Sequence, residues 1–205
     1  MTPQPAATGE LAFATPTDWF AIDLPGTPVD ADRLARHIVT THPRLAGQRD
    51  ALAEMLSGLT EVTQAVRAVG AYGALFDASG VALPATLLVS VQPMGGHGLD
   101  QIGREMAGAD HPGVASAMKI FDLPAGPTVR VERLIEPSAS DDERRPVSFT
   151  VKYVAEVPGR DQVVVLTFGT PALALIDQLR PVFHQIACSL LINPAGHVEP
   201  PVEAD

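Results

Sequence analysis

The last third of this 205-residue chain contains two apolar segments, 147–156 and 162–169, joined by a short turn and followed by a stretch with one apolar face. Side chains of a β-strand alternate between its two faces. The apolar positions of the first segment share one face: Val147, Phe149, Val151 and Tyr153. The second segment is apolar on both faces, which is typical of a central strand that is covered from both sides. We therefore predict a β-hairpin closed by a C-terminal helix.

The turn and the helix have signals of their own. Pro158 presets φ and Gly159 tolerates positive φ, and both suit a short hairpin loop. Thr170 is placed to cap free backbone amides, and Pro171 to occupy the first helical position. Apolar residues then recur at three- and four-residue spacing and predict one buried stripe: Ala172, Leu175, Ile176, Leu179, Val182, Phe183, Ile186 and Leu190. Pro181 predicts a bend in this helix without a break in the stripe.

Earlier segments predict the other elements of an α+β domain with an antiparallel β-sheet flanked by helices. The expected strands cover 18–24, 72–77, 83–92, 118–123 and 128–136, the first of them paired with 11–14. The expected helices cover 30–42, 48–69 and 99–106, with Gly70 as the stop of the second. Trp19 is expected to pack beneath a flanking helix. Residues 11–192 form one domain in this prediction, with disordered tails at 1–10 and 193–205.

The strand at 128–136 shows a strict alternation. Its apolar positions are Val129, Val131 and Ile135, and its charged positions are Arg130, Glu132 and Glu136. Alternation of this kind predicts one buried face and one face exposed to water.

Composition excludes several classes of protein. The formal charge of −10 argues against nucleic acid and anionic membranes as partners, because both require clustered cations. The single Cys188 excludes an intramolecular disulfide, and we interpret both Cys188 and His184 as packing residues of the terminal helix. No Lys or Arg precedes Arg33, and no apolar run is long enough to span a bilayer. Together with twelve Arg against two Lys, these features predict a cytoplasmic bacterial protein without membrane insertion.

The order of the elements resembles the PsbP-like α/β/α sandwich. The likeness is carried by DWFAIDLP at 18–25, by the hairpin 147–169 and by the helix that begins at Thr170. The superfamily includes the extrinsic photosystem subunit that names it, a Ran-binding nuclear import factor and LpqN-type actinobacterial lipoproteins. The resemblance covers most of 11–192 and implies a non-catalytic adaptor or assembly factor. The chain departs from the pattern in having no lipobox cysteine or export signal, and in a longer helical block at 30–69.

Polar side chains gather between residues 93 and 113, and we predict that this surface binds another protein. The candidate residues are Met94, His97, Asp100, Arg104, Asp110 and His111. His97 and Asp100 lack the helical context of a zinc-binding pair, so we expect no metal cofactor. The Gly-rich run at 95–98 lacks the ending of a phosphate loop. A connection without function is the alternative, and the charged loop 138–145 is a second candidate surface.

Two other functions compete with the protein-binding adaptor. The first is a carrier of a small apolar ligand, with a cavity between the sheet and the long helix lined from Leu87, Val89 and Val91. The second is a metal-dependent hydrolase, because Ser90, His97 and Asp100 lie close in the sequence. Ser90 falls inside a predicted strand without a nucleophile elbow, which argues against catalysis. We therefore predict a non-enzymatic protein without a cofactor, whose partner is another protein.

Overall fold

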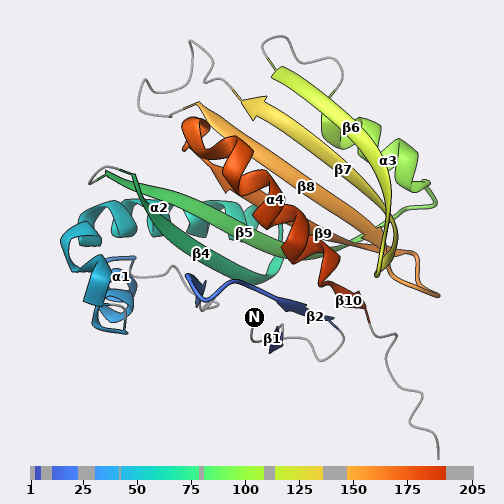
Figure 1. The fold of residues 1–205 in the computed structure, drawn as a ribbon. Helices are drawn as coiled ribbons and strands as arrows, with labels where there is room; N and C mark the ends of the chain where they lie inside the picture. Colours follow the sequence, from blue (N-terminus) through green and yellow to red (C-terminus); the bar gives the residue numbers. More distant parts are fainter. Residues whose placement is uncertain are drawn as a thin grey trace, which may run out of the picture.

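The chain folds around a seven-stranded antiparallel sheet with the strand order β3-β4-β5-β9-β8-β7-β6. The structure is a computed structural model that describes residues 3–5, 11–22, 31–41, 43–78, 81–108, 114–135 and 147–192. Helices flank the sheet on both sides, so the predicted α+β class and the antiparallel sheet are confirmed (Figure 1). The tail expected at 193–205 and the charged loop at 138–145 lie outside the described residues.

The elements follow the chain in this order. The strands of the large sheet are β3 (Trp19–Ile22), β4 (Ala68–Ala78), β5 (Val81–Pro93), β6 (Val114–Leu123), β7 (Gly126–Ile135), β8 (Ser148–Glu156) and β9 (Gln162–Thr170). A three-stranded sheet joins β1 (Pro3–Pro5), β2 (Leu11–Ala14) and β10 (Leu191–Ile192). The helices of the described residues are α1 (Ala31–Thr41), α2 (Arg49–Ala65), α3 (Leu99–Ala107) and α4 (Ile176–Cys188), with 3₁₀ turns η1 (Pro43–Gln48) and η2 (Leu173–Leu175). None of these helices is both long and apolar enough to cross a membrane.

The hairpin predicted from the sequence is present. β8 pairs with β9 from Phe149 opposite Thr170 to Glu156 opposite Val163. Its turn places Gly159 at φ 75°, a conformation that glycine adopts without steric cost, and the Val157 amide donates to the Gln162 carbonyl over 2.9 Å. β9 lies between β5 and β8, and Val163, Val164, Val165 and Leu166 are all buried. The near-continuous apolar run thus marks a strand that is covered on both faces.

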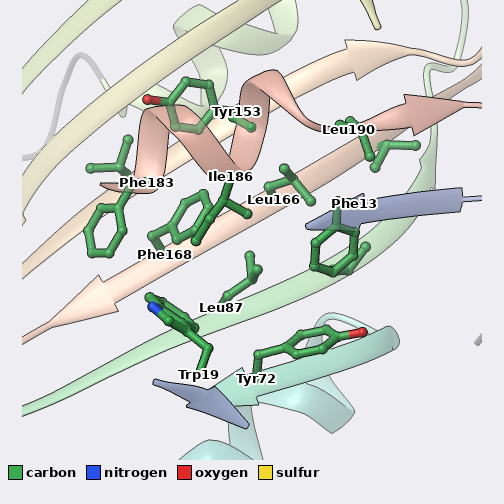
Figure 2. Close-up of a cluster of buried hydrophobic side chains, with 14 of the residues drawn as sticks. Phe13, Trp19, Tyr72, Leu87, Tyr153, Leu166, Phe168, Phe183, Ile186 and Leu190 are labelled. Carbon is green, nitrogen blue, oxygen red and sulfur yellow. The ribbon is translucent and has the colours of Figure 1, made fainter. Parts of the chain in front are cut away.

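One face of the sheet packs against α4 and β2. Its core contains the interior side chains of six strands and the buried stripe of α4: Leu11, Phe13, Trp19, Tyr72, Leu87, Val89, Val151, Tyr153, Leu166, Phe168, Leu179, Phe183 and Ile186. The rings of Phe168 and Phe183 stack with centroids 4.6 Å apart, and Trp19 meets both edge-on (Figure 2). Trp19 is only 5% exposed, so its predicted role in packing is confirmed.

The opposite face is covered by two separate helical units. α1 and α2 pack on the β3–β5 half through Ile38, Leu52 and Leu56, against Ala71 and Leu88 of the sheet. α3 packs on the other half, where Ile102 meets Val154, Val163 and Val165. Together with α4 on the first face, these helices complete three layers (Figure 1).

Two predicted connections are wrong. The segment 11–14 pairs with β1 and β10, and not with β3, whose neighbour is β4. The second helix ends at Ala65, and Arg67 turns the chain at φ 49°, so Gly70 lies inside β4 and does not stop the helix. Apolar residues near the end of the predicted helix continue the periodicity by chance, because Val69 packs against the core from a strand.

The start of the terminal helix also differs from the prediction. α4 begins at Ile176, and η2 separates it from Thr170, which is the last residue of β9. The Thr170 hydroxyl accepts the Ala172 amide over 3.0 Å and donates to the Pro84 carbonyl over 2.8 Å. Thr170 thus closes the strand-to-helix turn and does not cap α4. The helix runs through Pro181 to Cys188, and its stripe is continuous as predicted.

Candidate functional site

The charged face of β7 is not open to water as the alternation predicts. Arg130 and Glu132 pair with Tyr153 and Val151 of β8, so they lie on the sheet face that carries α4. Their side chains are only 14% and 13% exposed. The strand is an interior one, between β6 and β8, and the flank of α4 shields this part of its surface. Sequence alternation identified the two faces correctly but not what covers the charged one.

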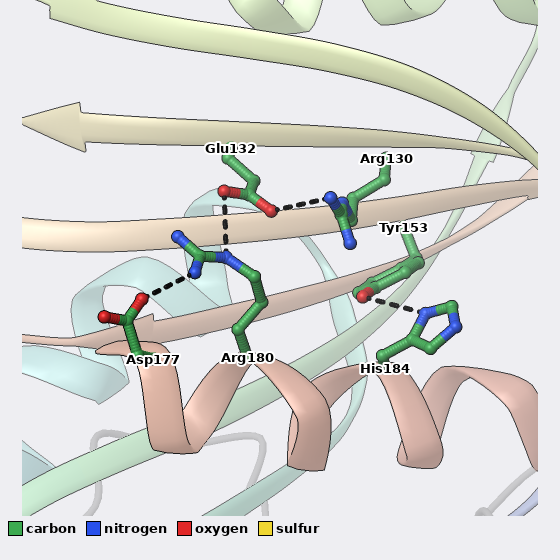
Figure 3. Close-up of polar contacts among 6 residues, drawn as sticks. All are labelled: Arg130, Glu132, Tyr153, Asp177, Arg180 and His184. Atoms are coloured by element: carbon green, nitrogen blue, oxygen red, sulfur yellow. Dashed lines mark hydrogen bonds and ion pairs between the residues drawn. The ribbon is translucent and has the colours of Figure 1, made fainter. Parts of the chain in front are cut away.

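A chain of ion pairs connects α4 to this face (Figure 3). Arg180 donates from Nε to Oε2 of Glu132 over 3.2 Å and from NH1 to Oδ1 of Asp177 over 2.9 Å. Arg130 approaches the other oxygen of Glu132, with its NH2 at 3.1 Å from Oε1. That second contact is electrostatic only, because Oε1 has no partner with hydrogen-bond geometry among the described residues. One carboxylate therefore serves two half-buried guanidiniums.

These side chains border a pocket of about 300 Å³ lined by Ala117, Lys119, Arg130, Glu132 and Arg180. Ala117 lies opposite Glu132, and Lys119 lies opposite Arg130, in the pairing of β6 with β7. Lys119 is exposed and has no hydrogen bond or ion pair with another described residue. Three cations and one carboxylate thus line the pocket, and Asp177, which pairs with Arg180, is 96% exposed. The pocket has a positive charge although the whole chain is at −10.

A second polar group adjoins the pocket toward the C-terminal end of α4. The Tyr153 hydroxyl lies 3.4 Å from Nδ1 of His184, and the Cys188 thiol lies 3.6 Å from Nε2 of the same ring. Burial raises the pKa of Tyr153, and the nearby Arg130 opposes that rise. Arg130 also lies over the Phe121 ring at 4.8 Å, a cation–π contact that fixes the guanidinium on its apolar side.

The residues predicted from the sequence as a partner surface do not form one cluster. The Met94 side chain packs against the core beneath α3, beside Ile102. His97 is exposed in the connection before α3, while Asp100 and Arg104 form an i,i+4 ion pair on the exposed side of that helix. Asp110 and His111 lie outside the described residues. The partner role of this surface therefore stays a prediction.

Hydrogen bonds nevertheless hold the connection that contains His97 in place. Gly95 and Gly96 have φ of 61° and 76°, and the Met94 amide donates to the Asp161 carbonyl over 3.0 Å. The Gly96 amide also reaches the Asp161 carboxylate over 3.4 Å. This end of β5 is thereby anchored to the turn of the β8–β9 hairpin.

The residues named for the apolar-ligand carrier and for the hydrolase are buried in the core or form ordinary hydrogen bonds. Leu87 and Val89 are fully buried against α4. The carrier hypothesis places them beside the long helix α2, which packs on the opposite face of the sheet. Ser90 is 3% exposed, and its hydroxyl accepts from the side-chain Nε2 of Gln92 over 3.2 Å. Within the described ranges, no three His, Cys, Asp or Glu residues lie together as a metal site would require.

Only some of the pocket residues have a pattern that can be recognised in the sequence. Arg130 and Glu132 stand out as alternating charges on a strand, and Lys119 follows on the preceding strand. Arg180 carries no such signal, because it lies next to the apolar stripe of α4 and is 48 residues from Glu132 in the sequence. No local spacing connects the two, so no sequence signal identifies the site.

Two solved structures are similar to this chain. The cyanobacterial PsbP protein CyanoP from Synechocystis sp. PCC 6803 matches with a TM-score of 0.50 at 11% identity, over 93% of this chain and 91% of that chain. LpqN, described as involved in cell envelope biogenesis of Mycobacterium tuberculosis, matches with a TM-score of 0.49 at 10% identity, over 94% and 85%. No family model matches the sequence, and no curated protein matches it. The match to CyanoP shows the PsbP-like fold that the sequence resemblance implies.

Proposed function

We propose that this PsbP-like protein is a non-catalytic accessory protein that binds an acidic group of another protein in the pocket between β6, β7 and α4. The observation that carries the proposal is the charge balance at Glu132. Its carboxylate is shared by Arg130 and Arg180, whose side chains are only 14% and 34% exposed, and the second counter-charge of Arg180, Asp177, is 96% exposed to water. Burial of a cation without full compensation is costly, and an incoming carboxylate removes that cost.

The arrangement of the cations also suits a docking group. Asp177 and Glu132 fix the Arg180 guanidinium, and Phe121 with Glu132 fixes that of Arg130. Side chains that are already ordered lose little conformational entropy on binding. Lys119 adds an exposed charge without a described partner at the mouth of the same pocket. Such a site attracts anions by its field and orients them by its fixed donors.

The lining of the pocket favours a carboxylate over a phosphate. Glu132 is itself part of the lining, and its negative charge repels a dianion more strongly than a monoanion. The aspartate and glutamate side chains of a protein partner carry one negative charge each, so Glu132 repels them less than it repels a phosphate dianion. A rigid surface with a few fixed charges is also how proteins select among partners.

The test is affinity capture from the native host with the full chain as bait. Lys119→Glu reverses an exposed charge at the pocket, and Arg104→Glu makes the same change on α3, on the opposite face of the sheet. We expect Lys119→Glu to abolish recovery of the partner and Arg104→Glu to leave it unchanged. Thermal melts that match wild type within a few degrees show that both variants are folded.

The reverse result has a defined meaning. Loss of the partner with Arg104→Glu and retention with Lys119→Glu would place recognition on the surface that contains His97, Asp100 and Arg104. Equal recovery by all three baits would overturn the pocket as the contact surface.

A further inference from the structure

β6 is an edge of the large sheet. It has ten residues, and among the described strands only β7 pairs with it. The opposite edge, β3, is only four residues long. Every second residue of an antiparallel edge strand points its N–H and C=O away from the sheet. β6 therefore offers a long row of backbone donors and acceptors with no partner strand in the described structure.

The side chains of β6 do little to block that edge. Ile120, near its middle, is 61% exposed, the largest exposed fraction of the large apolar side chains in the described structure. Ser116 and Ala117 are small and exposed. Lys119 is the charged residue at the centre of the strand, and it lines the pocket. An exposed edge that has one apolar side chain and one cation near its centre is a template for an added acidic strand.

The pocket lies directly beside this edge, because two of its lining residues, Ala117 and Lys119, belong to β6. Neighbouring strands lie about 4.8 Å apart. A strand added to β6 thus places alternate side chains next to Lys119, and Arg130 lies one strand further in, about 10 Å away. A glutamate on such a strand extends toward both cations from a backbone held by β6.

We propose that the partner presents its acidic group on an extended segment that adds to the sheet as an eighth strand along β6. This inference rests on the proposed function of the pocket and adds the mode of binding. Acidic side chains of the segment face Lys119, Arg130 and Arg180, and the alternate positions are apolar and cover Ile120 on the other face. Backbone hydrogen bonds supply affinity, and the pocket selects for acidic residues.

A second copy of this chain is a poorer occupant of the edge than an acidic segment. Paired residues of an antiparallel sheet point to the same face. In two-fold registers that overlap most of β6, the two Lys119 side chains lie opposite one another or on a diagonal, beside two positive pockets. Like charges in these positions are destabilising. An acidic strand has the complementary charge.

The probe is a random twelve-residue peptide library displayed on phage and selected against the full chain. We expect the enriched peptides to alternate Asp or Glu with Val, Ile, Thr or aromatic residues. A synthetic copy of the best peptide should bind at least tenfold more weakly to Lys119→Glu and within twofold to Arg104→Glu, measured by fluorescence anisotropy. Hydrogen exchange should show protection of the amides of β6 in the complex.

The outcomes separate this inference from the proposed function. Binding that depends on Lys119 without protection of β6 would overturn strand addition and retain the pocket. Binding that is indifferent to Lys119, or a library without enriched acidic peptides, would overturn both. Protection of β6 that appears in the free protein with rising concentration would identify a second copy as the occupant, against the inference.

Discussion

Arg180 on α4 donates from Nε to Oε2 of Glu132 on β7 over 3.2 Å, and so links the terminal helix to a strand 48 residues earlier. α4 packs its apolar stripe on the centre of the sheet, while this contact lies at the flank of the helix. The ion pair therefore stabilises the packing of the helix on the sheet and also shapes the pocket.

Glu132→Gln should destabilise the protein. The change keeps the shape of the side chain but leaves two half-buried guanidiniums without their shared counter-charge, and we expect the free energy of unfolding to fall by about 1–3 kcal/mol. Urea denaturation measures it. Asp177→Asn is the control, because that carboxylate is 96% exposed and its loss should change stability by less than about 0.5 kcal/mol. Equal effects of the two changes would contradict the role of burial.

Gly103→Ala should destabilise the packing of α3 on the sheet. A Cβ at this position would lie 2.6 Å from Cγ1 of Val129 and 2.8 Å from Sδ of Met118. Val129 is fully buried and stiff, so the clash outweighs the helix propensity of alanine, with an expected cost of about 1–3 kcal/mol. Gly47→Ala is the control, because its Cβ meets nothing within 4 Å. Thermal melts should show a lower Tm for Gly103→Ala alone, and recovery when Val129→Ala is added.

Phe183→Ala should cost about 3–5 kcal/mol, because it removes a fully buried ring that stacks on Phe168. The ring also lies 6.2 Å from Trp19, the single tryptophan of the chain, whose emission should shift to the red as its surroundings loosen. Fluorescence during denaturation gives both readings in one experiment. Phe183→Leu should cost less than half as much, and an unchanged emission maximum in Phe183→Ala would contradict the packing of Trp19.

Lys152→Met should stabilise the protein at neutral pH. Burial lowers the pKa of the Lys152 amine, and the Arg133 charge lowers it further. Between that lowered pKa and the ordinary value of 10.5, the unfolded chain holds more protons than the folded one. The cost of burying the charge is thus full below the lowered pKa and disappears as the pH approaches 10.5. We expect a gain of roughly 0.5–1 kcal/mol at pH 7.

Denaturation of Lys152→Met at several pH values checks the sign of this effect. The gain over wild type should shrink as the pH rises toward 10.5, the ordinary pKa of lysine. A gain from Lys152→Met that stays constant with pH would indicate a packing effect instead.

Thr170→Val should weaken the turn between β9 and η2. The hydroxyl is buried, accepts the Ala172 amide and donates to the Pro84 carbonyl, so an isosteric methyl removes both hydrogen bonds. The expected loss is about 1–3 kcal/mol, measured by urea denaturation. Thr170→Ser keeps both hydrogen bonds and should recover most of the stability; a loss as large as that of valine would contradict their importance.

Local periodicity predicted the elements well, and most of its errors concern their ends and partners. The β8–β9 hairpin, α3 and the strand pair β4–β5 are present as predicted. The predicted helix at 48–69 ran too far because Val66 and Val69 continue its spacing, while Arg67 turns the backbone. The segment 11–14 has the pattern of a strand, but that pattern does not show which strands it pairs with. In the structure it pairs with β1 and β10.

The amino-acid sequence alone determined the architecture of the last third. Alternating apolar residues in 147–169 and the stripe of α4 are local signals, since strand and helix periods lie within a few residues of one another. Only the tertiary structure decided that the charged side of β7 is half buried and joined to Arg180. That outcome depends on where α4 rests on the sheet, and the burial of a charge is a property of its neighbours in space. The site therefore became visible only when segments far apart in the chain came together.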